Sequence, residues 1–372
     1  MPDQTLTLDA LTRALEVRDL TDPLQGPHAL QRLLTAIHEA LAARWHCQRY
    51  VYRTSPLVSV TDNYDRLGFT PDAVSRDARY TRYVTARFLL RTHTSAMIPG
   101  LLRALALDPP ADMLLICPGL VYRRDSIDRL HTGEPHQLDL WRIKRGRLTI
   151  ADLHTMVQTV VQAAIPGSRF RVVPASHPYT THGLQIDIAA KQEWVEIGEC
   201  GLAAPAILAQ AGLETTCITV LAMGLGLDRL VMLRKGINDI RFLRAADPRI
   251  ARQMLDLAPY VPVSRQPPIR RDLSVAVTRE MTAEELGDRI REALADRVGQ
   301  LESVNVLSEV PYEELPAAAH ARMGMCPGQK SVLLRLVIRD PVRTLTRTEA
   351  NDLRDAVYRA VHQGTRLELA NA

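Results

Sequence analysis

The stretch "ITVLAMGLGLDRLVMLRKGINDIR" (218–241) constrains the fold of this chain more than any other part of the sequence. An apolar run leads into Gly224 and Gly226, and an apolar segment follows directly after an aspartate and an arginine. This pattern predicts a strand that ends at the glycines and turns at once into a buried helix. A dinucleotide-binding turn is excluded, because Arg229 stands where a third glycine is needed and no parallel βαβ unit surrounds it. An arginine beside backbone that a ligand can approach closely instead suits a nucleotide polyphosphate.

The sequence before this stretch alternates between helical and strand-like patterns. Residues 28–44 place leucine and isoleucine at helical spacing, which predicts an amphipathic helix. Segments 111–125 and 136–146 are typical of two strands around a polar loop, and further short strands are expected between 170 and 201. Many strands flanked by helices predict an α+β domain built on an antiparallel sheet.

The composition changes after residue 258. The segment "PYVPVSRQPPIRRD" (259–272) is rich in proline and arginine, as is typical of a linker. Beyond it, the order strand, helix 283–294, strand, strand 331–338 and helix 346–361 follows the split βαβ, ferredoxin-like plan. We therefore expect two domains, over residues 1–258 and 259–372.

Composition restricts the class of protein further. The five cysteines are scattered and form no CxxC pair, so they indicate reduced thiols and not a disulfide framework or a zinc site. No apolar run approaches the length that crosses a bilayer, and the first residues resemble neither a secretory signal nor a transit peptide. These features predict a cytoplasmic protein without a membrane partner. The net charge is only +4, but arginine supplies nearly all of the positive charge, since lysine occurs at just four positions.

A second stretch, "GLVYRRDSIDRLHTGEPHQLDLWR" (119–142), settles the family to which the sequence is most similar. Its Y-R-x-D followed by a loop and a strand resembles motif 2 of class II aminoacyl-tRNA synthetases, and GLGLDR before an apolar helix resembles motif 3. The order of these motifs with "LLRTHTSAM" (89–97) is similar to that in the catalytic subunit of phenylalanyl-tRNA synthetase. The C-terminal part resembles the ferredoxin-fold anticodon-binding domain of that family, and the layout on one chain is similar to the single-chain organellar enzyme.

The resemblance implies a ligase that activates an amino acid with ATP and transfers it to tRNA. Arg123 would hold the α-phosphate and the substrate carboxylate, and Arg229 the γ-phosphate end of ATP. His131 would lie near the phosphates, so that these three carry the catalytic role. The full set implied for ATP binding is Arg123, Asp125, His131, Glu196 and Arg229. Magnesium would be held by Asp187 and Glu196, because hard divalent cations prefer carboxylate oxygens; the alternative for these two is a solvated strand face.

The same resemblance places an amino-acid pocket. His93 and Ser95 in THTS, with Gln137 and Asp139 in HQLD, match family residues that hold the α-amino group, and Ala222 and Gly224 match the far end of the pocket. Where the family has Phe-Pro-Phe, we expect Val173, Pro174 and Ala175, which would remove two rings that clasp phenylalanine. Asp125 and Asp139 stand where glutamate is usual. Phenylalanine is thus the default substrate, but the side-chain pocket is altered.

The C-terminal domain is not basic overall. Residues 262–372 contain sixteen lysines and arginines and sixteen acids, so nucleic-acid binding requires the positive charges to gather on one face. The candidates for phosphate contacts with tRNA are Arg265, Arg270, Arg271, Arg343 and Arg347. The alternative is that these arginines face solvent and balance the acids.

Two other functions remain open from the sequence. One is a paralogue that activates a different acid for a carrier or a natural-product pathway, and the other is a non-catalytic tRNA-binding or regulatory relative. The retained pair of Arg123 and Arg229 argues against the second, because a binding module has no need of both. A monomer and a homodimer are both compatible with the resemblance.

Overall fold

The chain divides into two compact units. The computed structural model describes residues 5–190, 193–263 and 267–367. The first unit comprises residues 1–123, 134–237 and 252–260, and the second comprises 124–133, 238–251 and 261–372. Residues 124–133, which belong to the polar loop between two strands of the first unit, thus group with the C-terminal part of the chain. The expected boundary between residues 258 and 259 stays a proposal.

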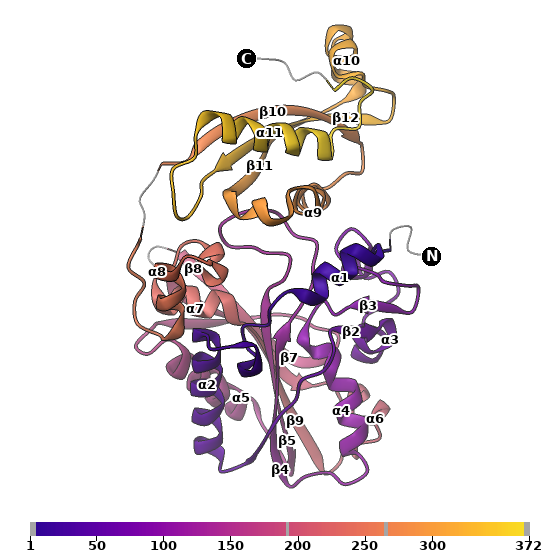
Figure 1. The fold of residues 1–372 in the computed structure, drawn as a ribbon. Coiled ribbons are helices and arrows are strands. Elements are labelled where there is room, and N and C mark those ends of the chain that lie inside the picture. The colour runs from indigo at the N-terminus through magenta and orange to yellow at the C-terminus, as the bar shows by residue number, and fades with distance from the viewer. Residues whose placement is uncertain (1–4, 191–192, 264–266, 368–372) are drawn as a thin grey trace. The chain divides into compact units, whose positions relative to one another are not determined.

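A seven-stranded sheet forms the centre of the first unit (Figure 1). Its strand order is β1-β4-β5-β9-β8-β7-β6, and every neighbouring pair is antiparallel except β1 and β4, which are parallel. The strands are β1 (Gln48–Val51), β4 (Asp112–Leu120), β5 (His136–Arg145), β6 (Phe170–Pro174), β7 (Thr180–Ala190), β8 (Glu193–Ala203) and β9 (Ile218–Gly226). This sheet confirms the α+β prediction. A separate two-stranded sheet pairs β2 (Leu57–Ser59) with β3 (Phe88–Leu90).

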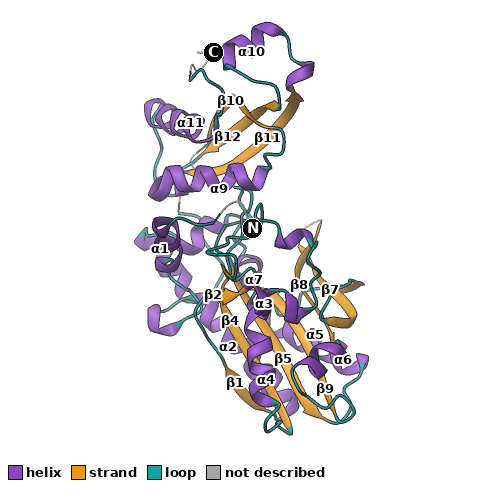
Figure 2. Ribbon diagram, turned by 90° about the vertical axis from the view of Figure 1, so that its right-hand side faces the viewer, coloured by secondary structure: helices purple, strands orange, loops and turns teal. Residues whose placement is uncertain are grey.

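Helices cover both faces of the large sheet, as Figures 1 and 2 show. The amphipathic helix predicted for 28–44 is α2, and its apolar positions such as Leu33 and Ile37 are fully buried. It packs with α5 and α7 on one face, while α4 and α6 lie on the other. The helices of this unit are α1 (Leu8–Glu16), α2 (Ala29–Trp45), α3 (Val60–Asn63), α4 (Ile98–Leu105), α5 (Ile150–Ala164), α6 (Pro205–Gln210) and α7 (Leu227–Lys235). Because both faces are covered, β4 and β5 are almost continuously buried.

The second unit contains the ferredoxin-like domain, and its order of elements confirms the sequence prediction. Its three-stranded sheet has the order β10-β12-β11 and is antiparallel throughout. Helices α9 and α11 bury their apolar faces against Leu273, Val275 and Val277 of β10. The elements are α8 (Pro248–Ala251), β10 (Ile269–Thr278), α9 (Ala283–Leu294), β11 (Leu301–Pro311), α10 (Ala317–Met323), β12 (Gln329–Ile338) and α11 (Arg347–Val361). Helices α9 and α11 both begin with capping boxes, at Thr282 and Thr346.

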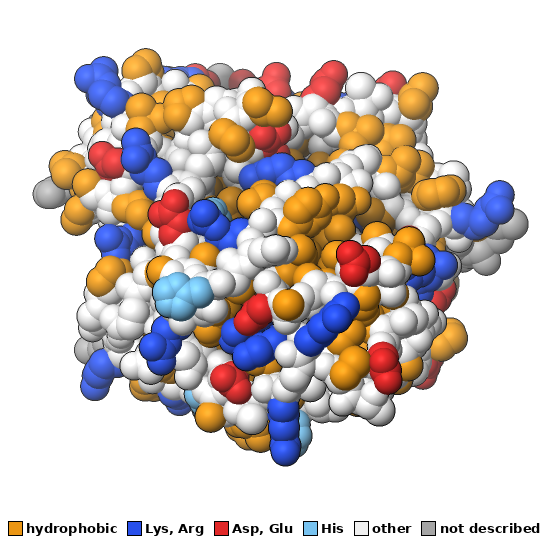
Figure 3. Space-filling model, turned by 90° about the horizontal axis from the view of Figure 1, so that it is seen from below, with side chains coloured by type: hydrophobic (Ala, Val, Ile, Leu, Met, Phe, Trp, Pro, Cys, Tyr) orange, Lys and Arg blue, Asp and Glu red, His pale blue; other side chains and the backbone are white. Residues whose placement is uncertain are grey.

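The surface carries both signs of charge. On the face seen from below in Figure 3, arginine, lysine and acidic side chains are interspersed among hydrophobic ones. The high arginine content therefore does not produce a uniformly basic surface on that face. None of the helices among the described residues is long and apolar enough to span a bilayer.

Candidate active site

The glycine-marked turn joins β9 directly to helix α7. Gly226 is the residue before the first helical position, and Asp228 and Arg229 lie in the first turn of α7. A side-chain carbon added to either Gly224 or Gly226 would meet no atom closer than 3.9 Å. The two glycines therefore leave open space on the sheet surface, which a larger side chain would occupy. This is the physical role of the closely spaced glycines that the sequence displays.

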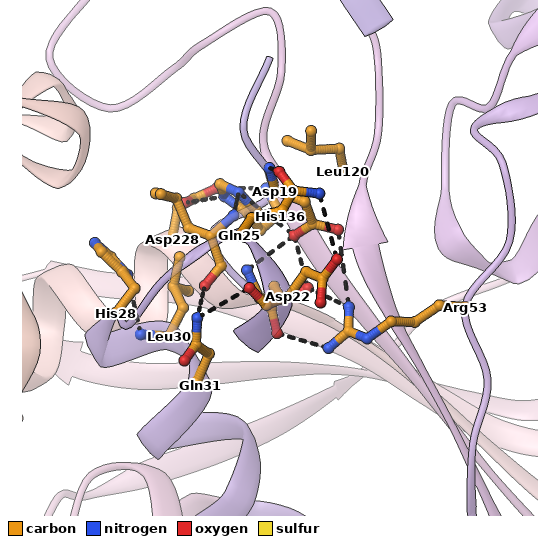
Figure 4. A network of polar contacts seen from close by, with 12 residues as sticks. Asp19, Asp22, Gln25, His28, Leu30, Gln31, Arg53, Leu120, His136 and Asp228 are labelled. Carbon is orange, nitrogen blue, oxygen red and sulfur yellow. Dashed lines mark hydrogen bonds and ion pairs between the residues drawn. The ribbon is translucent and has the colours of Figure 1, made fainter. Parts of the chain in front are cut away.

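Asp228 fixes the helix to the neighbouring strand through the buried His136 (Figure 4). Its carboxylate accepts hydrogen bonds from the Nδ1 and the backbone N–H of His136. The Nε2 of His136 accepts from the backbone N–H of Leu20, 3.0 Å away, so the ring is neutral with its proton on Nδ1. The first residue of β5 and the first turn of α7 are thereby held together, which orients Arg229 over the sheet.

Arg123 and Arg229, predicted to act together, each donate to a backbone carbonyl oxygen, and the charges of both act on the Glu196 carboxyl. Nη1 of Arg229 donates to the carbonyl oxygen of Glu196 at 3.0 Å, and Nε of Arg123 donates to the carbonyl oxygen of Thr92 at 2.8 Å. Partial burial raises the pKa of the Glu196 carboxyl, and nearby acids raise it further, whereas the charges of Arg229 and Arg123 lower it. Both guanidinium groups are thus within electrostatic range of one side chain, although 106 positions separate them in the sequence (229 − 123).

The two acids predicted to hold magnesium are neighbours on adjacent strands. Asp187 on β7 is the register partner of Glu196 on β8. Asp187 is buried, and its carboxylate accepts from Arg171 at 2.9 Å and from Gln185 at 2.7 Å. No group of three or more His, Cys, Asp or Glu side chains suited to a metal occurs in the described ranges. Two carboxylates still fit Mg²⁺, because this ion retains several waters and uses few protein ligands.

Asp139, predicted to bind the α-amino group, is buried at the base of the site. Its carboxylate accepts hydrogen bonds from Thr94 Oγ1 at 2.6 Å, Ser95 Oγ at 2.9 Å and Trp141 Nε1 at 3.0 Å. Burial raises the pKa of Asp139, while these three hydrogen bonds lower it. The predicted neighbours Ser95 and Asp139 are therefore in direct contact. Three side chains of the protein itself therefore donate hydrogen bonds to the Asp139 carboxylate.

His93 lies above this group in an aromatic environment. Its ring stacks on Phe69 with centroids 5.6 Å apart and meets Tyr64 edge to face at 6.2 Å. Burial and the charge of Arg123 lower the pKa of His93 to about 3, so the ring is neutral near pH 7. The backbone of Asn63 lies beside the ring, but within the described part of the chain no hydrogen bond of good geometry reaches either ring nitrogen. Both ring nitrogens are buried, and the ring is packed among the aromatic side chains.

The structure changes the expected position of the aromatic motif. Val173 and Pro174 lie on β6, the edge strand of the sheet, where Val173 pairs with Gln185, and Ala175 follows the strand. The ring that lies in the site is that of Tyr179, whose centroid is 6.2 Å from that of Trp141 and 6.3 Å from that of Phe69. We therefore propose that the motif corresponds to His177-Pro178-Tyr179 and not to residues 173–175.

The sequence contains the pattern that identifies this position. His177 and Tyr179 place a ring on each side of a proline, as in Phe-Pro-Phe, and their centroids are 6.0 Å apart. Sequence reasoning missed both, along with Phe69 and Glu199. Of the two predicted residues at the far end of the pocket, Gly224 lies beside Asp139, while Ala222 belongs to a hydrophobic core cluster with Trp141. Gln137 lies on the same strand as Asp139 and pairs with Gly226.

Two predicted ATP-binding residues, Asp125 and His131, belong to the second unit and are described within it. The carboxylate of Asp125 accepts from the backbone N–H of Ser126, and its carbonyl oxygen accepts from Arg291. His131 Nδ1 lies 2.8 Å from Asp128 Oδ2. Their proposed contacts with ATP stay a prediction.

Three of the arginines predicted to bind tRNA, Arg271, Arg343 and Arg347, lie at the first turns of α11, and Arg270 lies apart from them. Arg271 lies on the side of β10 that carries Leu273 and Val275, and its Nε donates to Asn351 of α11. Arg270, one residue earlier, projects from the opposite face. Arg343 forms an ion pair with Glu349 at 2.7 Å. Arg347 is the exposed first residue of α11, and Arg265 lies outside the described residues.

Comparison with known proteins agrees with this fold. The family model for the class II core domain of tRNA synthetases matches residues 22–254, and the model for the ferredoxin-fold anticodon-binding domain matches residues 264–369. The chain therefore belongs to the class II aminoacyl-tRNA synthetases.

Within that class, similar curated relatives include phenylalanine--tRNA ligases. The chain is 30% identical to the chloroplastic/mitochondrial phenylalanine--tRNA ligase of Arabidopsis thaliana over 330 residues, which cover 85% of this chain and 71% of the relative. It is 32% identical to the phenylalanine--tRNA ligase alpha subunit of Prochlorococcus marinus strain MIT 9313, covering 64% of this chain and 70% of the relative. The alpha subunit of Streptococcus pneumoniae strain Hungary19A-6 is also 32% identical, with 51% of this chain and 58% of that subunit covered.

Proposed function

We propose that this protein activates an amino acid with ATP and transfers the resulting acyl group to tRNA. The observation that carries this proposal is that Arg123 and Arg229 lie within range of one carboxylate, Glu196. Both guanidinium groups are fixed by hydrogen bonds to backbone carbonyl oxygens, Arg229 at Glu196 and Arg123 at Thr92. Such groups stabilise the negative charge that develops on phosphate oxygens during phosphoryl and nucleotidyl transfer.

The proposed first step joins the carboxylate of the amino acid to ATP. A carboxylate oxygen attacks the α-phosphorus, the bond to the bridging oxygen breaks, and pyrophosphate leaves. Arg123 would orient the carboxylate and the α-phosphate, and Arg229 would hold the γ-phosphate end. Magnesium held by Glu196 and Asp187 would neutralise phosphate charge. In the second step a tRNA hydroxyl attacks the acyl carbon, and AMP leaves.

The substrate is the open part of this proposal. Phenylalanine is the default from the relatives, but His177 and Tyr179 replace two apolar rings with polar ones. A paralogue that loads a carrier with another acid keeps the same activation chemistry. Residence in the cytoplasm and the choice between monomer and homodimer stay predictions.

ATP–pyrophosphate exchange tests the activation step. We expect the full chain to exchange labelled pyrophosphate into ATP in the presence of at least one amino acid, because exchange requires only the first step. The assay should compare all standard amino acids and non-standard analogues. An absence of exchange with every one of them would contradict amino-acid activation.

Binding of tRNA to the C-terminal domain predicts a steep dependence on salt. Replacing the exposed Arg270 with alanine should weaken tRNA binding and reduce the slope of log affinity against log salt by roughly 0.7–0.9, which corresponds to one lost phosphate contact. Arg322→Ala is the matched comparison, because Arg322 is an exposed arginine on α10 of the same unit and is not among the predicted phosphate contacts. Filter binding over a range of salt concentrations measures both. Equal slopes for the wild type and Arg270→Ala would exclude Arg270 from the RNA contact.

A further inference from the structure

Two carboxylates flank the open space beside Gly224. Asp139 on β5 and Glu199 on β8 are both register partners of Gly224, one on each side. Residues that pair across antiparallel strands project to the same face of the sheet, so the two acids and the missing side chain of Gly224 share one surface. An added side-chain carbon at Gly224 would meet only Asp139, at 3.9 Å. This position therefore has an acid on either side, on the neighbouring strands β5 and β8.

Glu199 is held in place by His177. The Nε2 of His177 lies 2.5 Å from Oε2 of Glu199, while 39% of the Glu199 side chain stays exposed. The charge of Glu199 raises the pKa of both Glu196 and Tyr179. Its carboxylate retains acceptor capacity after the bond to His177, because each carboxylate offers about four lone-pair positions.

Tyr179 brings a hydroxyl to the same surface. Burial raises its pKa, and the negative charge of Asp139 raises it further, while a hydrogen bond with the Ser95 side chain lowers it. The hydroxyl is thus among the polar groups of Ser95 and Asp139, and the ring stacks on Trp141 at 6.2 Å. Trp141 is fully buried and is the register partner of Ala222, so the indole packs over the position where the family pocket ends.

These groups are poorly matched to a phenyl ring. Trp141 packs with Ala222 in a hydrophobic cluster, and Tyr179, His177 and Glu199 form a chain of contacts beside it. An apolar ring placed there would remove water from these groups without replacing its hydrogen bonds. A side chain that ends in a hydroxyl, amide or ammonium group would instead donate to them. Sites built to hydrogen-bond a substrate group discriminate strongly against analogues that lack it.

We propose that the amino acid activated here has a polar, hydrogen-bond-donating side chain smaller than that of phenylalanine, recognised by Glu199 and Tyr179. This inference rests on the proposed function, since it names the substrate class of the same site. It makes Glu199, Tyr179 and His177 the residues that determine side-chain specificity, with Trp141 limiting the size of the pocket.

Pyrophosphate exchange with matched variants tests the proposal. The panel contains serine, threonine, asparagine, glutamine, ornithine and lysine against phenylalanine and leucine. We expect the wild type to prefer at least one polar member over phenylalanine by about tenfold or more in kcat/KM. Glu199→Ala and Tyr179→Phe should each reduce that ratio by about tenfold. Glu193→Ala, an exposed acid on the same strand, should leave it unchanged.

Further measurements separate failure of this inference from failure of the activation chemistry. Glu199→Gln keeps the size of the side chain and should show an intermediate ratio if Glu199→Ala fails to fold. A wild-type preference for phenylalanine over every polar member would overturn the inference while leaving activation intact. If no amino acid supports exchange, calorimetric titration of the full chain with the same panel decides: binding of a polar member supports the inference, and binding of phenylalanine alone, or of none, overturns it.

Discussion

Replacing Arg229 with alanine should lower kcat/KM for pyrophosphate exchange by about 10²–10³-fold, equivalent to about 2.7–4 kcal/mol of transition-state stabilisation. The reason lies in the geometry of the first turn of α7. Asp228 fixes this turn to His136, so the Arg229 guanidinium is held in advance at the carbonyl oxygen of Glu196. A group fixed in this way stabilises developing phosphate charge without reorganising during the reaction. Arg123→Ala should give a loss of the same order, because Arg123 follows the end of β4 and its charge also acts on the Glu196 carboxyl.

Two variants distinguish a loss of charge from a loss of structure. Arg229→Lys keeps a positive charge but not the planar fork of donors, so it should recover only part of the activity. Arg44→Ala removes an exposed arginine in the last turn of α2 and should leave exchange unchanged. If Arg229→Ala exchanges pyrophosphate at the wild-type rate and loses only tRNA charging, the guanidinium does not act on ATP in the way proposed.

Helices and strands were predictable wherever the periodic pattern of apolar residues extends over a long segment. Helix 28–44 appears as α2 with its apolar stripe buried, and the β-α-β-β-α order after residue 259 matches β10 to α11. Both have strong periodicity and clear caps. The parallel pairing of β1 with β4 had no such pattern, because strand direction within a sheet is decided by the path of the chain and not by local alternation. Helix α10 was missed because Ala317–Met323 is short and begins without a side-chain cap.

Parts of the site were predictable where several polar residues lie close together in one short sequence motif. THTS, HQLD and GLGLDR each place their residues within a few positions of one another, and the structure brings Ser95 and Asp139 into contact. The position of the aromatic motif was not predictable in the same way. Two prolines, Pro174 and Pro178, precede β7, and only the packing of Tyr179 against Trp141 shows which of them is flanked by rings in the site. Glu199 was missed because an acid on a strand is usually solvated, and only the register with Gly224 shows that it faces open space.

Trp141 connects the stability of the first unit with the chemistry of the site. Its indole is fully buried in a hydrophobic cluster with Met97 and Ala222, and its Nε1 donates to Asp139. Replacing Trp141 with alanine should therefore lower the free energy of unfolding by about 3–5 kcal/mol, through lost burial and the cavity left behind. Urea denaturation followed by far-UV circular dichroism measures this change, because it does not depend on tryptophan fluorescence.

Trp194 provides the matched control for this prediction. It is 42% exposed on β8, and the guanidinium of Arg171 lies 4.6 Å from its ring centroid. An exposed cation–π contact contributes only about 0.5–1 kcal/mol, so Trp194→Ala should change stability by no more than that. Trp141→Phe retains a buried ring but removes the N–H that Asp139 accepts, and should cost about 1–3 kcal/mol. Equal losses of stability for Trp141→Ala and Trp194→Ala would show that Trp141 is not tightly packed in the core. The proposal that Trp141 limits the size of the substrate side chain would then be contradicted.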